Sequence, residues 1–280
     1  MLIVALAGTR YRVERPWGDI PLGRALVSDV ACDKWGHVFV LLRHDSYLDP
    51  DLPAVIELSP DGRRLAAWGG GEIADGHMLT TAPDGRILVV DRDAHQVLLF
   101  NSKGRRFGAL GERNAPGTPL NHPSGVAVAP WGDMYVAGGY GSTQVHHFAS
   151  DHSYLGAWGA PGTGPCEFST PHGIHATADG RVLVTDREND RVQVFSRAGK
   201  FLAQWRGFSR PMDICTDQSG NVLVSDQVPR LHLLSPEGEP MGMCRPVLNG
   251  GHGIWRDGAG RIYLAELSPS RLTRLVPEEG

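Results

Sequence analysis

Residues 171–205, PHGIHATADGRVLVTDRENDRVQVFSRAGKFLAQW, contain one complete copy of the unit from which the fold can be predicted. Val182 and Val184 alternate with other residues in one segment, and segment 191–195 repeats this period of two, which is typical of β-strands. Gly180 and Gly199 lie between segments and indicate tight turns. We therefore expect one antiparallel sheet of four strands, formed by an apolar strand that begins near residue 171 and by residues 181–185, 191–195 and 201–205.

The same pattern recurs along the chain. In each copy a glycine closes the first turn and an apolar strand follows it directly, as RVLVTD follows Gly180. These register glycines are spaced 49, 47, 48, 40 and 40 residues apart, close to the ~40–50 residues of a four-stranded propeller blade. The six register glycines are Gly36, Gly85, Gly132, Gly180, Gly220 and Gly260.

Six such units predict an all-β protein, a six-bladed β-propeller. A ring of blades has no free sheet edge when the last blade is completed by the other end of the chain. The sixth unit stops one strand short, soon after Leu275, whereas residues 11–14 have no blade of their own. We therefore expect the N-terminal strand to close the final blade as its outer strand. We interpret residues 1–280 as a single domain, with an insertion at residues 45–53 that forms a loop over one face.

Composition narrows the possible partners. The formal net charge is −4, and Lys and Arg are scattered among Asp and Glu, so we expect no nucleic-acid partner. The four cysteines show neither a metal-type spacing nor a disulfide framework. Residues 1–8 are apolar but too short for a signal peptide or a membrane span. We therefore expect a cytoplasmic protein with no membrane partner; the oligomeric state is left open.

Histidine occupies one repeat position in every second blade. Eight residues before the register glycine, where the innermost strand begins, the second, fourth and sixth units hold His77, His172 and His252. Alternate blades of a six-bladed ring lie about 120° apart, so these side chains are expected to converge on the axis. Three imidazoles with an open fourth position form a catalytic type of zinc site. The alternative is that these are three surface or channel-lining histidines that share this position by chance, from the 12 in the chain.

Two further residues are expected near the same mouth of the channel, in the loops after the second strands. Arg43 ends an apolar strand, where a charge has no structural need, although an ordinary solvated arginine explains it as well. Tyr140 lies in a Gly-Gly-Tyr-Gly turn, whose glycines let the backbone kink and leave the ring exposed. A tyrosine that packs on the top of a blade is the alternative for this position.

Four stretches of the chain resemble NHL-repeat proteins related to peptidyl-α-hydroxyglycine α-amidating lyase. The resemblance covers blades one to four and six, and blade five matches only the generic repeat. NHL repeats also occur in scaffolds and RNA-binding proteins, so the histidine-bearing PHG and GHG segments and the DREN and GGYG turns are the more specific signal. The stretches are DGHMLTTAPDGRILVVDRDAHQVLLF, AGGYGSTQVHHF, GAWGAPGTGPCEFSTPHGIHATADGRVLVTDREND and GHGIWRDGAGRIYLAELS.

The resemblance implies a set of roles for these residues. It places the three zinc ligands of the family on His77, His172 and His252, with one Zn²⁺ per chain at the channel mouth. It places the active-site arginine on Arg43 and the catalytic tyrosine on Tyr140. The implied reaction cleaves the C–N bond of an α-hydroxyglycine carbinolamide, giving an amide and glyoxylate. In it Tyr140 would receive the hydroxyl proton, and Arg43 would bind the substrate carboxylate.

The chain also departs from the family pattern. Gly253 stands where the lyases have an acidic calcium ligand, so the sequence does not support a structural Ca²⁺ there. Gly250 stands where they have a methionine, which implies a different substrate pocket. The disulfides of the lyases have no counterpart among these cysteines.

Three classes of function therefore remain open. The first is a zinc-dependent lyase acting on a small-molecule or peptide carbinolamide, and it is the one we predict. The second is a metal-dependent propeller hydrolase such as a lactonase, which histidines in place of axial carboxylates disfavour. The third is a non-catalytic NHL interaction scaffold, which would leave the alternating histidines unexplained.

Overall fold

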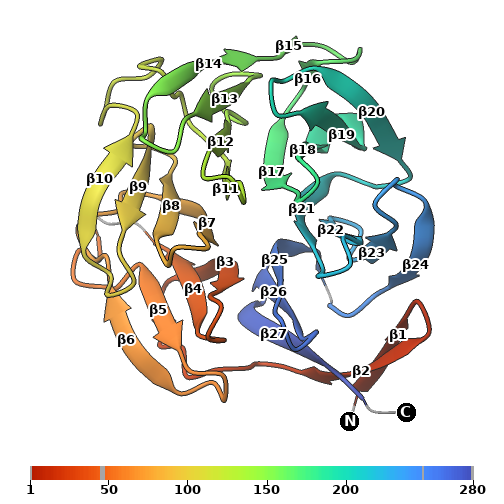
Figure 1. Cartoon of the computed structure of the whole chain (residues 1–280). Helices are drawn as coiled ribbons and strands as arrows, with labels where there is room; N and C mark the ends of the chain where they lie inside the picture. The colour runs from red at the N-terminus through yellow and green to blue at the C-terminus, as the bar shows by residue number, and fades with distance from the viewer. Residues whose placement is uncertain (1, 45–47, 248, 279–280) are drawn as a thin grey trace.

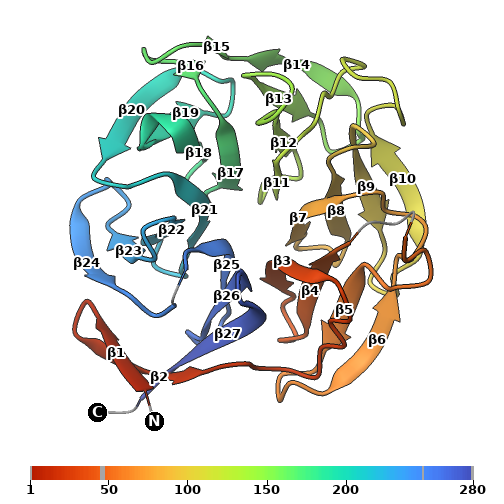
Figure 2. The same ribbon diagram turned by 180° about the vertical axis from the view of Figure 1, so that it is seen from behind.

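The chain forms a closed ring of six antiparallel sheets around a central axis (Figure 1). The structure is a computed structural model, and it describes residues 2–44, 48–247 and 249–278. Five of the sheets in the ring have four strands and the last has five. The prediction of an all-β, six-bladed β-propeller is confirmed. Both ends of the chain lie at the sixth blade, as the two opposite views show (Figures 1 and 2).

In blades one to five the strands follow one another in chain order, from the innermost to the outermost (Figure 1). Blades one to three consist of β3 (Leu26–Cys32), β4 (Val38–Arg43), β5 (Val55–Leu58), β6 (Arg64–Trp68), β7 (Gly76–Thr81), β8 (Ile87–Asp91), β9 (Gln96–Phe100), β10 (Arg106–Leu110), β11 (Gly125–Val128), β12 (Met134–Ala137), β13 (Val145–Phe148) and β14 (Tyr154–Trp158). Blades four and five consist of β17 (Pro171–Ala176), β18 (Arg181–Asp186), β19 (Arg191–Ser196), β20 (Phe201–Arg206), β21 (Pro211–Thr216), β22 (Val222–Asp226), β23 (Leu231–Leu234) and β24 (Pro240–Cys244).

Two short elements lie outside this pattern. The strands β15 (Ala160–Pro161) and β16 (Glu167–Phe168) form a small parallel pair between blades three and four. A single 3₁₀ turn, η1 (Arg187–Asn189), follows β18. Within the described residues, no helical segment has the length and hydrophobicity that a bilayer crossing needs.

Blade six is built from both ends of the chain. It consists of β25 (Gly251–Arg256), β26 (Ile262–Leu267), β27 (Ser270–Pro277), β2 (Thr9–Glu14) and β1 (Leu2–Leu6). The strand β2 pairs antiparallel with β27, with Val13 opposite Leu275, so the predicted closure by the N-terminal strand is confirmed. The strand β1 then pairs with β2 and becomes a fifth strand, which the repeat pattern did not indicate. The closing strand is therefore not the outermost one.

The six register glycines share one backbone conformation, with φ between 78° and 98°. Each amide N–H bonds to the carbonyl oxygen three residues earlier, which closes a tight turn between the inner strand and its neighbour. Glycine adopts this left-handed region without the steric cost that other residues meet. The register inferred from the sequence therefore marks a real turn in every blade. Of the predicted insertion, residues 45–47 lie outside the described residues, and residues 48–53 form no strand.

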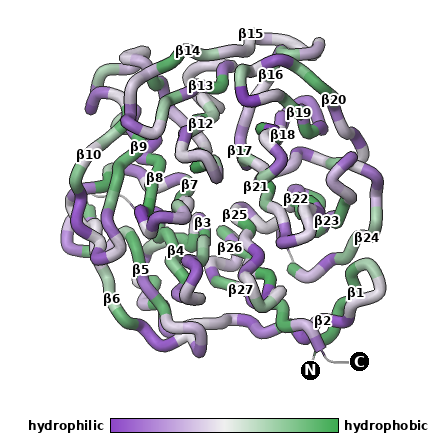
Figure 3. Tube along the Cα trace, viewed as in Figure 1, coloured by the Kyte–Doolittle hydropathy of each residue, from purple (hydrophilic) through white to green (hydrophobic). Residues whose placement is uncertain are grey.

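The core lies between the blades. Among the described residues, buried apolar side chains form six clusters, and each cluster joins two neighbouring blades around the ring. One cluster packs Val38 and Val40 of blade one against Tyr263 and Leu272 of blade six, across the closure. Figure 3 shows hydrophobic residues along β8 and β9, the middle strands of blade two. Because every blade buries both faces, the ring holds the inner strands at fixed positions around the axis.

Candidate metal centre and active site

The three predicted histidines stand near the beginnings of the inner strands β7, β17 and β25. In each of these strands the pairing with the next strand shifts register at the histidine, as it does between Gly251 and Gly253 around His252. A β-bulge of this kind leaves one residue out of the ladder and re-aims its side chain. The bulge thereby lets the histidine leave the alternation of the strand and face the other two.

The structure brings His77, His172 and His252 together at the axis. Their ring centroids are 4.9–5.2 Å apart, with interplanar angles of 72–83°. One ring nitrogen of each lies within 4.8 Å of the corresponding atoms of the other two. All three side chains are buried. The convergence expected from the repeat register is therefore present, while metal binding itself stays a prediction.

Each imidazole is oriented by a carbonyl group of the next blade. His77 Nδ1 lies 2.6 Å from Ser124 O, and His172 Nδ1 lies 2.8 Å from Met212 O. His252 Nδ1 lies 2.8 Å from Ser28 O. A carbonyl oxygen can only accept a hydrogen bond, so Nδ1 carries the proton in each ring and Nε2 keeps its lone pair. The partner of one ring nitrogen thus leaves the other free to bind a cation, as in many metal-ligating histidines.

Serines at the same repeat position of blades one and three complete this arrangement, whereas blade five has Met212 there. Ser28 Oγ donates to His77 O at 2.7 Å. Ser124 Oγ lies 2.7 Å from Pro171 O and 3.0 Å from His172 O, and it donates to these carbonyls. Both serines are fully buried. Hydrogen bonds therefore link the starts of successive inner strands and hold two of the three histidine backbones.

The environment keeps the three rings neutral. Burial lowers the pKa of His77 and of His172 well below the ordinary value. The repulsion that each protonated ring would meet from a protonated His252 adds to the shift. Burial also lowers the pKa of His252 to about 4, with smaller contributions from Arg43 and Arg187. A neutral imidazole binds a metal without first losing a proton, so near pH 7 all three rings are ready to act as ligands.

Tyr140 caps the histidine cluster. Its hydroxyl group lies 3.1 Å from His77 Nε2 and 3.0 Å from His172 Nε2. The side chain of Arg187, the first residue of the 3₁₀ turn η1, donates from Nη1 to the same oxygen at 3.1 Å. The guanidinium groups of Arg92 and Arg187 stand 5.3 and 5.5 Å from the centre of the tyrosine ring. The ring is 40% exposed, so a ligand can reach it. The structure therefore places Tyr140 in contact with the histidines rather than in the packing of a blade top.

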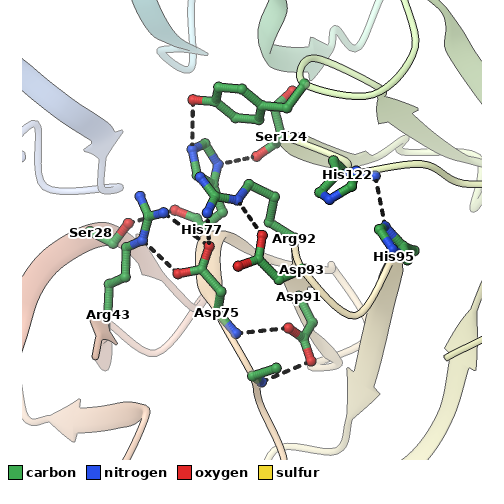
Figure 4. Close-up of polar contacts among 12 residues, drawn as sticks. Ser28, Arg43, Asp75, His77, Asp91, Arg92, Asp93, His95, His122 and Ser124 are labelled. Atoms are coloured by element: carbon green, nitrogen blue, oxygen red, sulfur yellow. Dashed lines mark hydrogen bonds and ion pairs between the residues drawn. The ribbon is translucent and has the colours of Figure 1, made fainter. Parts of the chain in front are cut away.

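Arg43 is held by an acidic partner. Its Nε and Nη2 donate to the two carboxylate oxygens of Asp75 at 2.6 and 3.0 Å. Arg92 Nη2 lies 2.9 Å from the same carboxylate, and Arg92 Nε donates to Asp93. Figure 4 shows Asp75 between the two arginines, close to His77. The side chain of Arg43 is thus held beside the site by its ion pair with Asp75, and it is not an ordinary solvated arginine at the end of a strand.

The Nε2 atoms of the three histidines show whether the site fits a metal ion. Three Nε2 lone pairs converge, and the single phenolic proton of Tyr140 can satisfy only one of them at a time. Among the described residues, no side chain donates a hydrogen bond to His252 Nε2. Three neutral nitrogen donors suit Zn²⁺, which takes three protein ligands and an open position in catalytic sites. The residues present therefore fit a zinc ion.

Three charged residues of the site are not singled out from the sequence: Asp75, Arg92 and Arg187. Yet Arg92 and Arg187 occupy the same repeat position as Arg43, seven residues past the register glycine. Reading that position in every blade would have found both of them. Asp75 lies two residues before His77, and no sequence pattern marks it as the partner of Arg43.

The structure shows why position 253, where the lyases have an acidic calcium ligand, is a glycine in this chain. A side chain on Gly253 would overlap the carboxylate of Asp29, which accepts hydrogen bonds from the amides of Val30 and Leu79. The space that an acidic residue would need at position 253 is therefore already filled.

Asp29 also borders a separate cavity of about 340 Å³ farther along the inner strands, which none of the three histidines lines. All four cysteines carry free thiols.

The chain is similar in sequence to proteins that contain NHL repeats and to amidating lyases. The sequence model described as NHL repeat matches residues 168–195. The chain is 29% identical to NHL repeat-containing protein 3 of Mus musculus, over 95% of this chain and 86% of that protein. It is also 29% identical to a probable peptidyl-alpha-hydroxyglycine alpha-amidating lyase of Caenorhabditis elegans, over 61% of this chain and only 55% of the lyase.

Solved structures agree on the architecture. A gluconolactonase from Xanthomonas campestris superposes with a TM-score of 0.74 over 96% of this chain and 90% of its own, at 13% sequence identity. Such a likeness shows the fold alone. The chain is therefore a six-bladed β-propeller that matches the NHL-repeat model over residues 168–195, and it is similar in sequence to NHL repeat-containing protein 3 and to peptidyl-α-hydroxyglycine α-amidating lyases.

Proposed function

We propose that this protein is a zinc-dependent lyase that cleaves the C–N bond of an α-hydroxyglycine-type carbinolamide and releases an amide and glyoxylate. The observation that carries the proposal is the contact of Tyr140 with two of three converging, neutral histidines. His77, His172 and His252 would hold the ion through Nε2. The chemistry that zinc supplies in such a site is Lewis-acid polarisation of the substrate hydroxyl, which eases the loss of its proton.

The reaction needs one proton acceptor and one proton donor. The hydroxyl proton leaves, the oxygen forms the C=O bond of glyoxylate, the C–N bond breaks, and the departing amide nitrogen takes up a proton. The phenolic oxygen of Tyr140, 3.0 Å from His172 Nε2, faces the place where the hydroxyl would bind, and we assign it the role of base. The Arg187 guanidinium, which donates to that oxygen, supplies the positive charge that a phenolate needs beside it. The protonated phenol can then return its proton to the leaving nitrogen.

The substrate carboxylate also needs a partner. Arg43 and Arg187 border the histidines from blades one and four, close enough for each to influence the pKa of His252. A guanidinium offers several N–H donors in a plane that matches a carboxylate. We assign Arg43 to binding the carboxylate of the α-hydroxyglycine. The bidentate pair with Asp75 fixes its position.

The other two classes of function have less support. Among the described residues, the metal-binding group contains three imidazoles and no carboxylate, unlike the acid-rich axial sites expected of lactonases. A scaffold would leave unexplained why three histidines from blades two, four and six converge at the axis with Nε2 free. The lyase accounts for the histidines, the tyrosine and the arginines together.

Elemental analysis of untagged protein tests the proposal first. We expect about one zinc per chain in the parent and in the control variant His37→Ala, whose ring pairs with Glu57 away from the axis, and none in His172→Ala. Glyoxylate release from an N-acyl-α-hydroxyglycine is then measured. Tyr140→Phe should keep the metal and lose activity by ~10²–10⁴-fold, the usual contribution of a general base. Absence of zinc from the parent, or full activity in Tyr140→Phe, would refute the mechanism.

A further inference from the structure

A cavity of about 540 Å³ opens beside the proposed active site, between the loops of blades one and two. Arg43 and Asp75 line this cavity and form the ion pair that lies close to His77 (Figure 4), so the cavity adjoins the site. Its volume lies in the range of small-molecule binding sites, ~300–1,000 Å³. Among the described residues, its polar lining is Arg24, Arg43, His44, Asp75, Asp93, Arg113 and Asn114.

The charge in this cavity is unbalanced. Its two described carboxylates are already engaged, because Asp75 pairs with both Arg43 and Arg92 and Asp93 pairs with Arg92. Arg24, in contrast, forms no hydrogen bond or ion pair with any described residue and is exposed.

Arg113 is likewise free of any described carboxylate. Its Nη1 donates only to the carbonyl oxygen of Glu72, at 3.4 Å, and its side chain is exposed. Neither Arg24 nor Arg113 therefore forms an ion pair with a described acidic side chain, although burial raises the pKa of Asp91 and the charge of Arg113 partly offsets that rise.

The imidazole of His44 also lacks a partner in this part of the structure. Both ring nitrogens are enclosed, and neither has a hydrogen-bond partner among the described residues. An enclosed polar atom without a partner costs free energy, and in folded proteins such groups are nearly always satisfied by protein, water or ligand. His44 lines the cavity, so a turn of its ring toward the cavity would let a ligand oxygen supply the missing partner.

We infer that this cavity binds a second carboxylate of the substrate, carried on the acyl side of the scissile C–N bond. The inference rests on the proposed function, because it assigns Arg43 to the carboxylate at the reacting end. The acyl chain would then run from the site toward Arg24 and Arg113, whose charges meet the distal carboxylate. The preferred substrates are therefore carbinolamides with an acidic acyl group, and amides with an uncharged acyl chain of equal length are poorer ligands.

The test uses ligands that bind without reacting. N-succinylglycine and N-butyrylglycine share the glycine carboxylate and have acyl chains of equal length, but only the first has a distal carboxylate. Neither carries the hydroxyl group that the reaction needs. Calorimetric titration of the zinc-loaded protein should show about tenfold tighter binding of N-succinylglycine, equal to ~1.4 kcal/mol, and the difference should shrink in high salt.

Variants assign the difference to the cavity. In the double variant Arg24→Gln, Arg113→Gln the two ligands should bind with nearly equal affinity. Arg63→Gln removes an equally charged but 84% exposed side chain of blade one that lies outside the cavity, and it should keep the tenfold ratio. Equal binding of the two ligands by the parent, or an unchanged ratio in the double variant, would overturn the inference.

Activity separates this inference from the proposed function. Glyoxylate release is compared for N-succinyl- and N-butyryl-α-hydroxyglycine, and the succinyl compound should have about tenfold higher kcat/KM. If neither compound releases glyoxylate while the tenfold binding preference persists, the lyase proposal fails and the anion site stands. If both release glyoxylate equally well and bind equally well, the lyase stands and the anion site is wrong.

Discussion

The serine hydroxyl between blades three and four offers a sensitive test of how the histidine cluster is held. Ser124 Oγ lies 2.7 Å from Pro171 O and 3.0 Å from His172 O, and all of its contacts are buried. Ser124→Ala removes this donor and leaves the backbone oxygen through which His77 Nδ1 is oriented. The substitution therefore acts on the position of the His172 backbone without changing any proposed ligand.

The size of the effect follows from the lost hydrogen bond. A buried carbonyl oxygen left without its donor costs ~1–3 kcal/mol of unfolding free energy. For a chain of this length, such a loss lowers Tm by roughly 2–5 °C. Loss of a partner that orients a metal ligand typically weakens metal binding ~10–100-fold. We expect Ser124→Ala to show both effects.

Two measurements separate the two effects. Thermal unfolding in the presence of a chelator reports the stability of the metal-free ring, and competition with a chromophoric chelator reports the zinc Kd. Ser153→Ala, which removes an exposed hydroxyl that donates to Asp151, is the matched control and should leave both values near those of the parent. If Ser124→Ala binds zinc as tightly as the parent and melts at the same temperature, the hydrogen bonds around the axis do not position His172.

Three further predictions concern the stability of the metal-free protein, each measured by urea denaturation. Burial lowers the pKa of His146 from 6.5 to about 4, so its neutral ring stabilises the fold above pH 6.5, and this stability is lost as the pH falls toward 4. His146→Gln should make the free energy of unfolding depend less on pH between 6.5 and 4. An unchanged pH dependence would contradict the assignment. Gly253→Ala, whose added methyl group overlaps Asp29, should cost at least ~1–3 kcal/mol, and a neutral result would show that the carboxylate moves aside readily. Arg191→Met leaves the fully buried Asp186 without its guanidinium and should cost ~3–5 kcal/mol; a loss under ~1 kcal/mol would mean that the pair is not needed.

The architecture could be predicted from the sequence because its signals are local. Each blade repeats a glycine turn and alternating strands within about 40–50 residues, and the six glycines that mark the register all adopt the same left-handed conformation. The closure by β2 followed from counting strands at the two ends of the chain. The alternation of His77, His172 and His252 followed from the same register, because a residue at one repeat position points the same way in every blade.

The working details of the site depend on contacts between blades. The carbonyl oxygens that fix Nδ1 and the pairing of Arg43 with Asp75 join residues of neighbouring blades, which lie up to 224 positions apart in the chain for His252 and Ser28. No local pattern encodes such a pair, because the partner is chosen by the geometry of the neighbouring blade. Local repeats in the sequence are thus enough to predict the number of blades and the residues that face the axis. Distances between blades decide which nitrogen of each histidine is free, which arginines stand around Tyr140 and where unpaired positive charge remains, so these features can be seen only in the folded chain.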